Sequence, residues 1–218
     1  MTIIQKPNAI LASIVVAVMT AGFFISQPVW AAIVDADQDG LSDAIEIKLG
    51  TDANNPDTDN DGYYDGAEIK NGFSPFEGGR SRKITRAVET DLTTQKFYYL
   101  VNGVRIGEML ASTGRPGVPT PTGEYKILKK IPVKTYRTVT GGSYPNTKWN
   151  MLFEAKRGLY LHGAYWHNDF GIRPRSGGCI NLTTADASQI YKFLDVGDKI
   201  KVYGKTPSGK VKITSAKN

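Results

Sequence analysis

The stretch YLHGAYWHNDFGIRPRSGGCINLTTADA, residues 160–187, contains the only cysteine and both histidines of the chain. The nucleophilic form of cysteine is the thiolate, and a free thiol forms it at neutral pH only beside a base or a cation. Histidine is the natural partner of such a thiol. His162 ends an apolar segment that can hold it rigidly, whereas His167 lies in a polar, aromatic loop. From these residue types alone, Cys179 is either a nucleophile or a small buried apolar residue.

The sequence SGGC at 176–179 places three consecutive backbone N–H groups beside little side-chain bulk. A turn of this kind can stabilise an oxyanion. Arg173 and Arg175 flank the turn, and two interpretations remain for them. They are either solvated loop charges, or they raise the local potential so that a thiolate is favoured and a carboxylate is attracted.

Two motifs of the chain are similar to the signature of the YkuD-type L,D-transpeptidases. In that signature, His-Gly is followed further along by Ser/Thr-His-Gly-Cys and then by an aliphatic residue with Asn or Arg. The segment VETDLTTQKFYYLVNGVRIGEMLASTGRPGVPTPTGEYKIL (88–128) also resembles the opening of that domain. The resemblance covers residues 84–204. It implies a mainly β, sandwich-like catalytic domain with a short helix after the cysteine.

The resemblance assigns roles to five residues of this chain. It implies that Cys179 is the nucleophile and His162 the general base. It implies that the carbonyl of Gly163 orients the imidazole, and that Ser176 is the serine of the motif. The backbone N–H groups of Gly178 and Cys179 match the oxyanion hole of the family.

One position departs from the family pattern, because Gly177 stands where the signature has histidine. The base remains, as His162, so the chemistry is still possible. The missing imidazole leaves open how the loop is packed, how substrate is held and how the thiolate is tuned. His167 is a weak candidate to replace it, because nothing in its loop fixes its position. The neighbouring aromatic residues are expected to form a pocket wall or to pack the loop. The candidate substrate-binding residues are Tyr165, Trp166, His167 and Arg175.

Local patterns support a strand-rich domain with one good helix. The pair Asn102-Gly103 between apolar runs predicts a tight hairpin. The segment 183–194 predicts a helix whose apolar residues share one face, and Thr183 with Asp186 forms a plausible capping box at its start.

Two acidic segments repeat 22 residues apart, DADQDGLSDAIEIKLG (35–50) and DTDNDGYYDGAEIKNG (57–72). Each matches D-x-D-x-D-G-x5-E, in which oxygens at positions 1, 3, 5, 7, 9 and 12 surround a calcium ion. The alternative is a solvated acidic linker. The candidate ligands are Asp35, Asp37, Asp39, Leu41, Asp43 and Glu46 in the first loop and Asp57, Asp59, Asp61, Tyr63, Asp65 and Glu68 in the second, with Leu41 and Tyr63 using backbone carbonyls.

The repeats differ from a paired EF-hand, because position 8 is Ser42 or Tyr64 rather than aliphatic, and no long helix precedes either loop. The pattern DxDxDGxxDxxE resembles the thrombospondin type 3 calcium repeats of exported bacterial proteins, over residues 33–74. The resemblance implies structural calcium in a spacer. The catalytic domain that the chain resembles needs no cofactor for catalysis.

Charge is divided unevenly along the chain. Residues 35–68 hold eleven acidic residues and one basic residue, Lys48, so this segment carries −10 and the remainder carries +16 of the formal net charge of +6. A basic body can face nucleic acid, acidic lipid or an anionic polymer. No nucleic-acid motif favours the first, so no nucleic-acid partner is expected.

The N-terminus predicts export. Lys6 is the only charged residue before Asp35, and residues 9–25 form an apolar run. Val29 at −3 and Ala31 at −1 suit cleavage after Ala31. The alternative is a retained membrane anchor at 9–25. The expected location is the periplasm or the cell wall. The expected organisation is a signal peptide or anchor at 1–31, calcium repeats at 33–74, a linker at 75–83, the catalytic domain at 84–204 and a basic tail at 205–218.

The resemblance implies a transpeptidase that acts on peptidoglycan. Cys179 would form a thioester with a stem tetrapeptide and transfer it to an amine, which gives a cross-link or an anchored protein. Water as the acceptor would make the enzyme an L,D-carboxypeptidase. Two non-enzymatic alternatives remain: a peptidoglycan-binding domain that lost activity with Gly177, and a calcium-dependent adhesion protein.

Overall fold

The computed structural model describes residues 34–138 and 141–211. The predicted signal peptide and the possible membrane anchor lie outside these residues. The described residues belong to one compact unit. Within the described parts of the chain, no helix has the length and apolar character needed to cross a bilayer.

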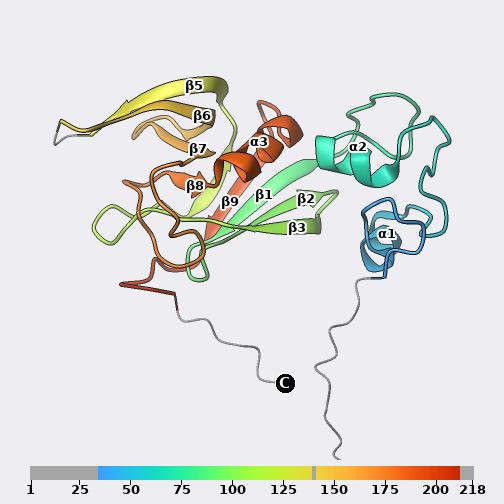
Figure 1. The fold of residues 1–218 in the computed structure, drawn as a ribbon, viewed down its shortest axis with the longest axis horizontal. Helices are drawn as coiled ribbons and strands as arrows, with labels where there is room; N and C mark the ends of the chain where they lie inside the picture. The colour runs from blue at the N-terminus through green and yellow to red at the C-terminus, as the bar shows by residue number, and fades with distance from the viewer. Residues whose placement is uncertain (1–33, 139–140, 212–218) are drawn as a thin grey trace, which may run out of the picture. The chain divides into compact units, whose positions relative to one another are not determined.

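Two β-sheets form the framework of the described chain (Figure 1), which confirms the prediction of a mainly β fold. The first has the strand order β3-β2-β1-β9-β4, and the second has the order β5-β6-β7-β8. The strands of the first sheet are β1 (Arg86–Asp91), β2 (Lys96–Val101), β3 (Val104–Leu110), β4 (Gly123–Lys126) and β9 (Lys199–Tyr203). The strands of the second sheet are β5 (Lys129–Arg137), β6 (Ser143–Glu154), β7 (Leu159–Gly163) and β8 (Ile180–Leu182).

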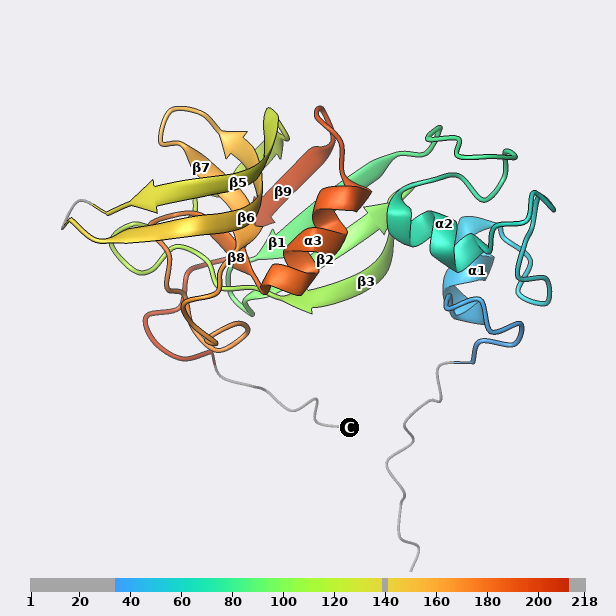
Figure 2. The same ribbon diagram turned by 45° about the horizontal axis from the view of Figure 1, so that its top comes forward.

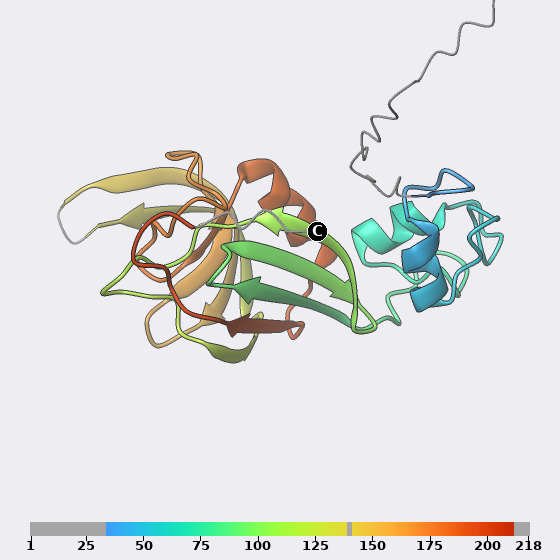
Figure 3. The ribbon, with the colours of Figure 1, turned by 90° about the horizontal axis from the view of Figure 1, so that it is seen from below.

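The predicted hairpin joins β2 to β3 at Asn102-Gly103. Both residues have positive φ, 49° and 82°, as the turn between twisted antiparallel strands requires. The last strand, β9, inserts beside β1 in parallel and also pairs antiparallel with β4. In the view from below, the green strands β1–β3 and the red strand β9 therefore lie side by side (Figure 3).

The predicted helix forms as α3 (Thr184–Phe193). It begins at Thr183, whose Oγ1 accepts the backbone N–H of Asp186 at 3.1 Å, as predicted from the capping box. Its buried face carries Ala187, Ile190 and Phe193 and packs against the second sheet beside β6 and β7 (Figure 2).

Aromatic pairs connect these layers. Tyr99 of β2 meets Phe193 of α3 edge-on at 5.7 Å between ring centroids, so the helix also contacts the first sheet. Tyr125 of β4 meets Phe153 of β6 at 5.4 Å, which joins the two sheets. Such pairs add about 1 kcal/mol each to the burial of their apolar area.

The acidic repeats form two loops that are each followed by a one-to-two-turn helix, α1 (Asp43–Leu49) and α2 (Asp65–Asn71). Both helices end at a glycine with positive φ, Gly50 and Gly72. At Gly72 a Cβ atom would lie 2.6 Å from the carbonyl oxygen of Phe193, so only glycine permits this close approach of α2 to the end of α3.

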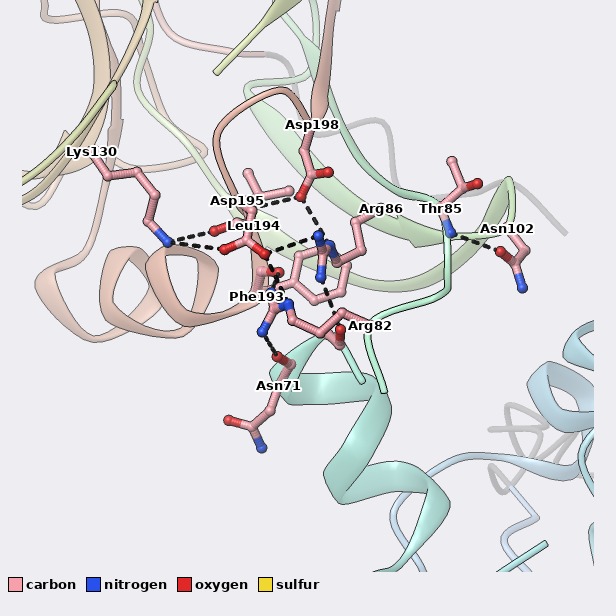
Figure 4. Close-up of polar contacts among 11 residues, drawn as sticks. Asn71, Arg82, Thr85, Arg86, Asn102, Lys130, Phe193, Leu194, Asp195 and Asp198 are labelled. Carbon is pink, nitrogen blue, oxygen red and sulfur yellow. Dashed lines mark hydrogen bonds and ion pairs between the residues drawn. The ribbon is translucent and has the colours of Figure 1, made fainter. Parts of the chain in front are cut away.

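Arg86, at the start of β1, connects three segments (Figure 4). Its guanidinium donates to Asp198 at 2.9 Å, to Asp195 at 3.0 Å and to the carbonyl of Gly72 at 3.0 Å. The side chain is only 8% exposed. A buried cation is tolerated only when its donors are satisfied, and these three acceptors come from α2 and from the loop between α3 and β9.

Arg82 and Lys130 complete the same cluster (Figure 4). Arg82 pairs with Asp195 at 2.8 Å and donates to the carbonyl of Phe193 at 3.1 Å. Lys130 of β5 donates to the carbonyl of Leu194 at 2.5 Å. Carbonyls at the ends of α2 and α3 thus accept hydrogen bonds from cations, which suits the negative end of the helix dipole.

We predict that Arg86→Met lowers the free energy of unfolding by about 2–3 kcal/mol, because it leaves Asp198 partly buried without its cation. Urea unfolding followed by circular dichroism measures this. The matched control is Arg105→Met in β3. The Arg105 guanidinium is 47% exposed, and its partner Glu89 keeps Lys201 at 3.9 Å, so this ion pair should contribute less than about 1 kcal/mol. Equal effects of the two substitutions would contradict the central role of Arg86.

Candidate active site and calcium loops

The parallel pairing of β7 with β8 places the predicted catalytic residues on one face. His162 lies opposite Asn181 in the register, and Cys179 immediately precedes β8. The backbone N–H of Tyr160 contacts the Cys179 sulfur at 3.4 Å. Because alternate residues of a strand point to the same face, the side chains of Tyr160, His162, Cys179 and Asn181 share one face. His162 and Cys179 are diagonal neighbours on it.

The imidazole of His162 is held in one orientation. It is 3% exposed, and its Nδ1 lies 3.0 Å from the carbonyl oxygen of Gly163. The carbonyl can only accept, so Nδ1 carries the proton and Nε2 is free to act as a base. Burial lowers the pKa of His162 to about 4, which the hydrogen bond to Gly163 only partly offsets. The ring is therefore neutral at pH 7.

Tyr136 is a site residue that the sequence did not reveal. Its ring stacks on His162 with 4.8 Å between centroids and meets Tyr160 edge-on at 5.7 Å. Its hydroxyl donates to the Asn150 side chain at 2.8 Å, and burial raises its pKa. Tyr136 therefore stacks on the base as a neutral phenol.

Cys179 is a protonated thiol at rest. Burial raises its pKa to about 11, and the backbone N–H of Tyr160 and the more distant cations Arg157 and Lys134 only partly oppose this. The thiol of Cys179 and the imidazole of His162, diagonal neighbours on this face, are thus both neutral. This arrangement needs proton transfer to His162 during the reaction rather than a preformed thiolate.

The turn before Cys179 is bonded internally. Ser176 Oγ donates to the carbonyl of Cys179 at 2.6 Å and accepts the N–H of Gly178 at 3.0 Å. The predicted oxyanion donor at Gly178 therefore already has a partner in its own turn. At Gly177 a Cβ atom would meet nothing within 4 Å, so the position leaves open space, while its carbonyl accepts from Arg157 at 3.3 Å.

Tyr165 and Trp166 pack the loop after β7 against β6 and the His162 ring. Trp166 lies 5.8 Å from the His162 ring and stacks on Tyr144 of β6 at 4.0 Å. The exposed Tyr165 donates its hydroxyl to the carbonyl of Pro145 at 2.8 Å. Both residues thus connect the loop after β7 to β6.

Two predictions for this loop need revision. Arg175 and Arg173 both pair with Asp169, the latter at 3.0 Å, so Arg175 is not a free cation facing the thiol. His167 is fixed, because its Nδ1 accepts the backbone N–H of Asp169 at 3.2 Å and its Nε2 lies 3.1 Å from the Asn181 amide. The sequence did not reveal these contacts, because they depend on how the loop after β7 folds back on itself and on β8.

Each acidic loop gathers three of its predicted ligands. The carboxylates of Asp35, Asp37 and Asp39 each place an oxygen within 4.8 Å of the others, and the second loop repeats this arrangement. The backbone N–H of Gly40 donates to Asp35 at 3.1 Å, and the backbone N–H of Gly62 donates to Asp57 at 2.8 Å. The corresponding residues of the second loop are Asp57, Asp59 and Asp61.

Buried carboxylate oxygens without partners indicate that these loops fit a hard cation. Glu46 is fully buried and Glu68 is 4% exposed, and both Glu68 oxygens and one of Glu46 have no hydrogen-bond partner. Burial, with added repulsion from neighbouring aspartates, raises the pKa of Glu46 to about 7 and of Glu68 to about 8. An oxygen-liganded cation such as calcium would neutralise them.

Position 9 of each loop holds the loop closed. Asp43 accepts the N–H of Ala36 at 3.0 Å, and both oxygens of Asp65 accept from Thr58, at 2.9 and 2.5 Å. These two predicted ligands are thus engaged with position 2 of their own loops. At position 7, Leu41 and Tyr63 donate their N–H groups to Asp39 and Asp61, at 2.6 and 2.9 Å.

Comparison with known families gives two matches. The L,D-transpeptidase catalytic domain, YkuD, matches residues 85–202. The bacterial TSP3 repeat matches residues 35–56 and 57–72, so the two resemblances seen in the sequence are confirmed.

Individual relatives carry the same domain. The probable L,D-transpeptidase 3 of Mycobacterium tuberculosis is 36% identical over 112 residues, which are 44% of this chain and 38% of that protein. L,D-transpeptidase 1 of the same organism is 33% identical over 121 residues, 52% of this chain and 48% of that protein. The chain thus spans less than half the length of these relatives.

A solved structure gives the same match in three dimensions. L,D-transpeptidase 3 from Mycobacterium tuberculosis, in complex with a faropenem-derived adduct, has a TM-score of 0.51 at 27% identity. The match covers 55% of this chain and 60% of that one.

We predict that EDTA increases protease cleavage between residues 35 and 72 and that calcium prevents it. Without a cation, the folded repeats hold Glu46 and Glu68 in the protonated form, because their pKa values in the folded state are about 7 and about 8. The resulting stabilisation is complete at pH values below 4.5, the ordinary pKa of a glutamate, and is lost as the pH rises through about 7 to 8. Cleavage in EDTA should therefore be faster at about pH 8.5 than at about pH 5. Identical digestion with calcium and with EDTA would rule out the metal sites.

We also predict that alkylation of Cys179 by iodoacetamide accelerates steadily from about pH 7 to about pH 10, because its raised pKa keeps the thiol protonated at neutrality. Intact-mass spectrometry measures the rate, and Cys179→Ala supplies the blank. A plateau near neutral pH would instead indicate a resting thiolate–imidazolium pair.

Proposed function

The chain belongs to the L,D-transpeptidase catalytic domain (YkuD) family, and we propose that it is an exported enzyme that cleaves and rejoins peptidoglycan stem peptides through a Cys179 thioester. The observation that carries this proposal is the common face of β7 and β8. There the thiol of Cys179 lies diagonally beside His162, whose Nδ1 is tied to the Gly163 carbonyl. A nucleophile with an oriented base is the arrangement that acyl transfer needs.

Acylation begins with proton transfer from Cys179 Sγ to Nε2 of His162. The thiolate attacks the carbonyl carbon of the L,D peptide bond after the third residue of a stem tetrapeptide. The C–S bond forms, and the carbonyl oxygen becomes an oxyanion near the turn at 176–179. The C–N bond then breaks, and D-alanine leaves with the proton from the imidazolium.

Deacylation reverses these roles. An amine of a second stem peptide, or of a protein, gives its proton to neutral His162 and attacks the thioester carbonyl. The C–S bond breaks, and Cys179 regains its proton. The low pKa of His162, about 4, keeps the imidazole unprotonated before each step. Water in place of the amine would give the L,D-carboxypeptidase reaction.

The acidic loops are proposed to hold structural calcium, with Asp35, Asp37, Asp39 and Glu46 in the first site. Asp57, Asp59, Asp61 and Glu68 would form the second, and backbone carbonyls of Leu41 and Tyr63 would complete them. Calcium would supply positive charge to the buried carboxylates, and catalysis would need no cofactor. The proposed location is the periplasm or the cell wall.

We predict a covalent β-lactam adduct at Cys179. Faropenem or a carbapenem should add its mass to the intact protein, and a tetrapeptide muropeptide should lose D-alanine. Cys179→Ala should abolish both. His162→Gln should slow both by about 100-fold or more, because the base is lost.

The non-catalytic alternative has its own signature. Binding of muropeptides without adduct or turnover would support a wall-binding domain. In that case Gly177→His, for which the structure has open space, would be expected to restore turnover. An active wild-type protein that changes little on Gly177→His excludes a decayed site.

A further inference from the structure

His167 has an ordered environment that the proposed acyl transfer does not use. Its ring is half-buried and packs on Phe170 with 4.7 Å between centroids. Both ring nitrogens have polar neighbours: the backbone N–H of Asp169 at Nδ1 and the Asn181 amide at Nε2. A ring held at both nitrogens has a fixed tautomer.

The tautomer follows from these contacts. Nδ1 accepts the N–H of Asp169, so Nδ1 carries no proton. Burial lowers the pKa of His167, which keeps the ring neutral at pH 7. The single proton of a neutral ring is then on Nε2. Nε2–H is a donor, and its neighbour Asn181 must supply an acceptor.

This requirement decides the orientation of the Asn181 amide. With Nδ2 toward His167, two donors would face each other, and Oδ1 would be buried without a partner in a side chain that is 1% exposed. The oxygen and nitrogen of an amide are interchangeable in shape, and hydrogen bonding decides between them. With the amide reversed, Oδ1 accepts from Nε2–H, and the contact between two donors disappears.

The reversed amide leaves an N–H₂ donor without a protein partner. Asn181 lies opposite His162 and two residues after Cys179, on the face that holds both. A buried amide N–H without an acceptor is costly, so this position favours a ligand that brings an oxygen. The need for another donor is greater here because Ser176 already occupies the N–H of Gly178.

We propose that His167 is a positioning residue that turns the Asn181 amide so that its N–H₂ group donates to a carbonyl or carboxylate oxygen of the acyl substrate. This inference rests on the proposed function of the same site. His167 contacts no substrate in this scheme and acts only through Asn181. It gives a role to the second histidine of a chain that has glycine at position 177.

The first test measures the tautomer directly in the whole, metal-loaded protein. Long-range ¹H–¹⁵N NMR distinguishes the two neutral tautomers and the imidazolium form. The expected result at pH 7 is an Nε2–H tautomer for His167 and an Nδ1–H tautomer for His162. An Nδ1–H tautomer or an imidazolium at His167 overturns the proposal, whether or not the protein is an enzyme.

The second test separates positioning from folding. His167→Phe keeps a ring beside Phe170 but removes the Nε2–H donor. It is expected to slow acylation by faropenem about 10- to 100-fold, while alkylation of Cys179 by iodoacetamide is unchanged. His167→Gln retains a side-chain amide donor and is expected to recover part of the loss. The matched control is Asn168→Ala, the exposed neighbour in the same loop.

Asn181→Asp completes the design. It keeps an oxygen for His167 but puts a second oxygen where the substrate donor would be, so acylation should fall at least as far as in His167→Phe. It should also raise the pKa of His167, as followed by NMR. Unchanged acylation in both variants overturns the inference. If the wild-type protein forms no adduct at all, the proposed function fails, and the tautomer measurement still decides the orientation of Asn181.

Discussion

The parallel pairing of β7 with β8 is the constraint on which the candidate active site depends. It aligns His162 with Asn181 and places Cys179 on the same face. A slip of one residue would turn one of the two groups to the opposite face. Because β8 has only three residues, other segments must hold it. Ser112 does so by exchanging two backbone hydrogen bonds with Asn181, at 2.9 and 3.0 Å.

Two buried groups of charges in this chain have different roles. Around Arg86, cations, aspartates and helix-end carbonyls satisfy one another, so this cluster joins α2 to the end of α3 without any ligand. In the acidic loops the buried oxygens of Glu46 and Glu68 have no cation, and their pKa values rise. Internal balance is typical of a structural cluster, whereas unbalanced carboxylates indicate a site for an external ion.

The two histidines differ by the partner of one nitrogen. Nδ1 of His162 faces a carbonyl, so that ring donates there and keeps Nε2 as a base. Nδ1 of His167 faces a backbone N–H, so that ring accepts there and can donate from Nε2. Burial lowers the pKa of both and keeps them neutral. Opposite tautomers thus give identical side chains different chemical roles.

The sequence by itself determined what depends on neighbours along the chain. The Asn102-Gly103 turn, the cap at Thr183 and the repeated acidic loops are local patterns, and the fold family follows from two motifs and their order along the chain. The tertiary structure alone decided that Tyr136 stacks on the base, that Asp169 neutralises Arg175, and that the loop around the second histidine is ordered. Those contacts depend on how loops and strands fold back on one another, and the spacing of residue types does not specify such pairings.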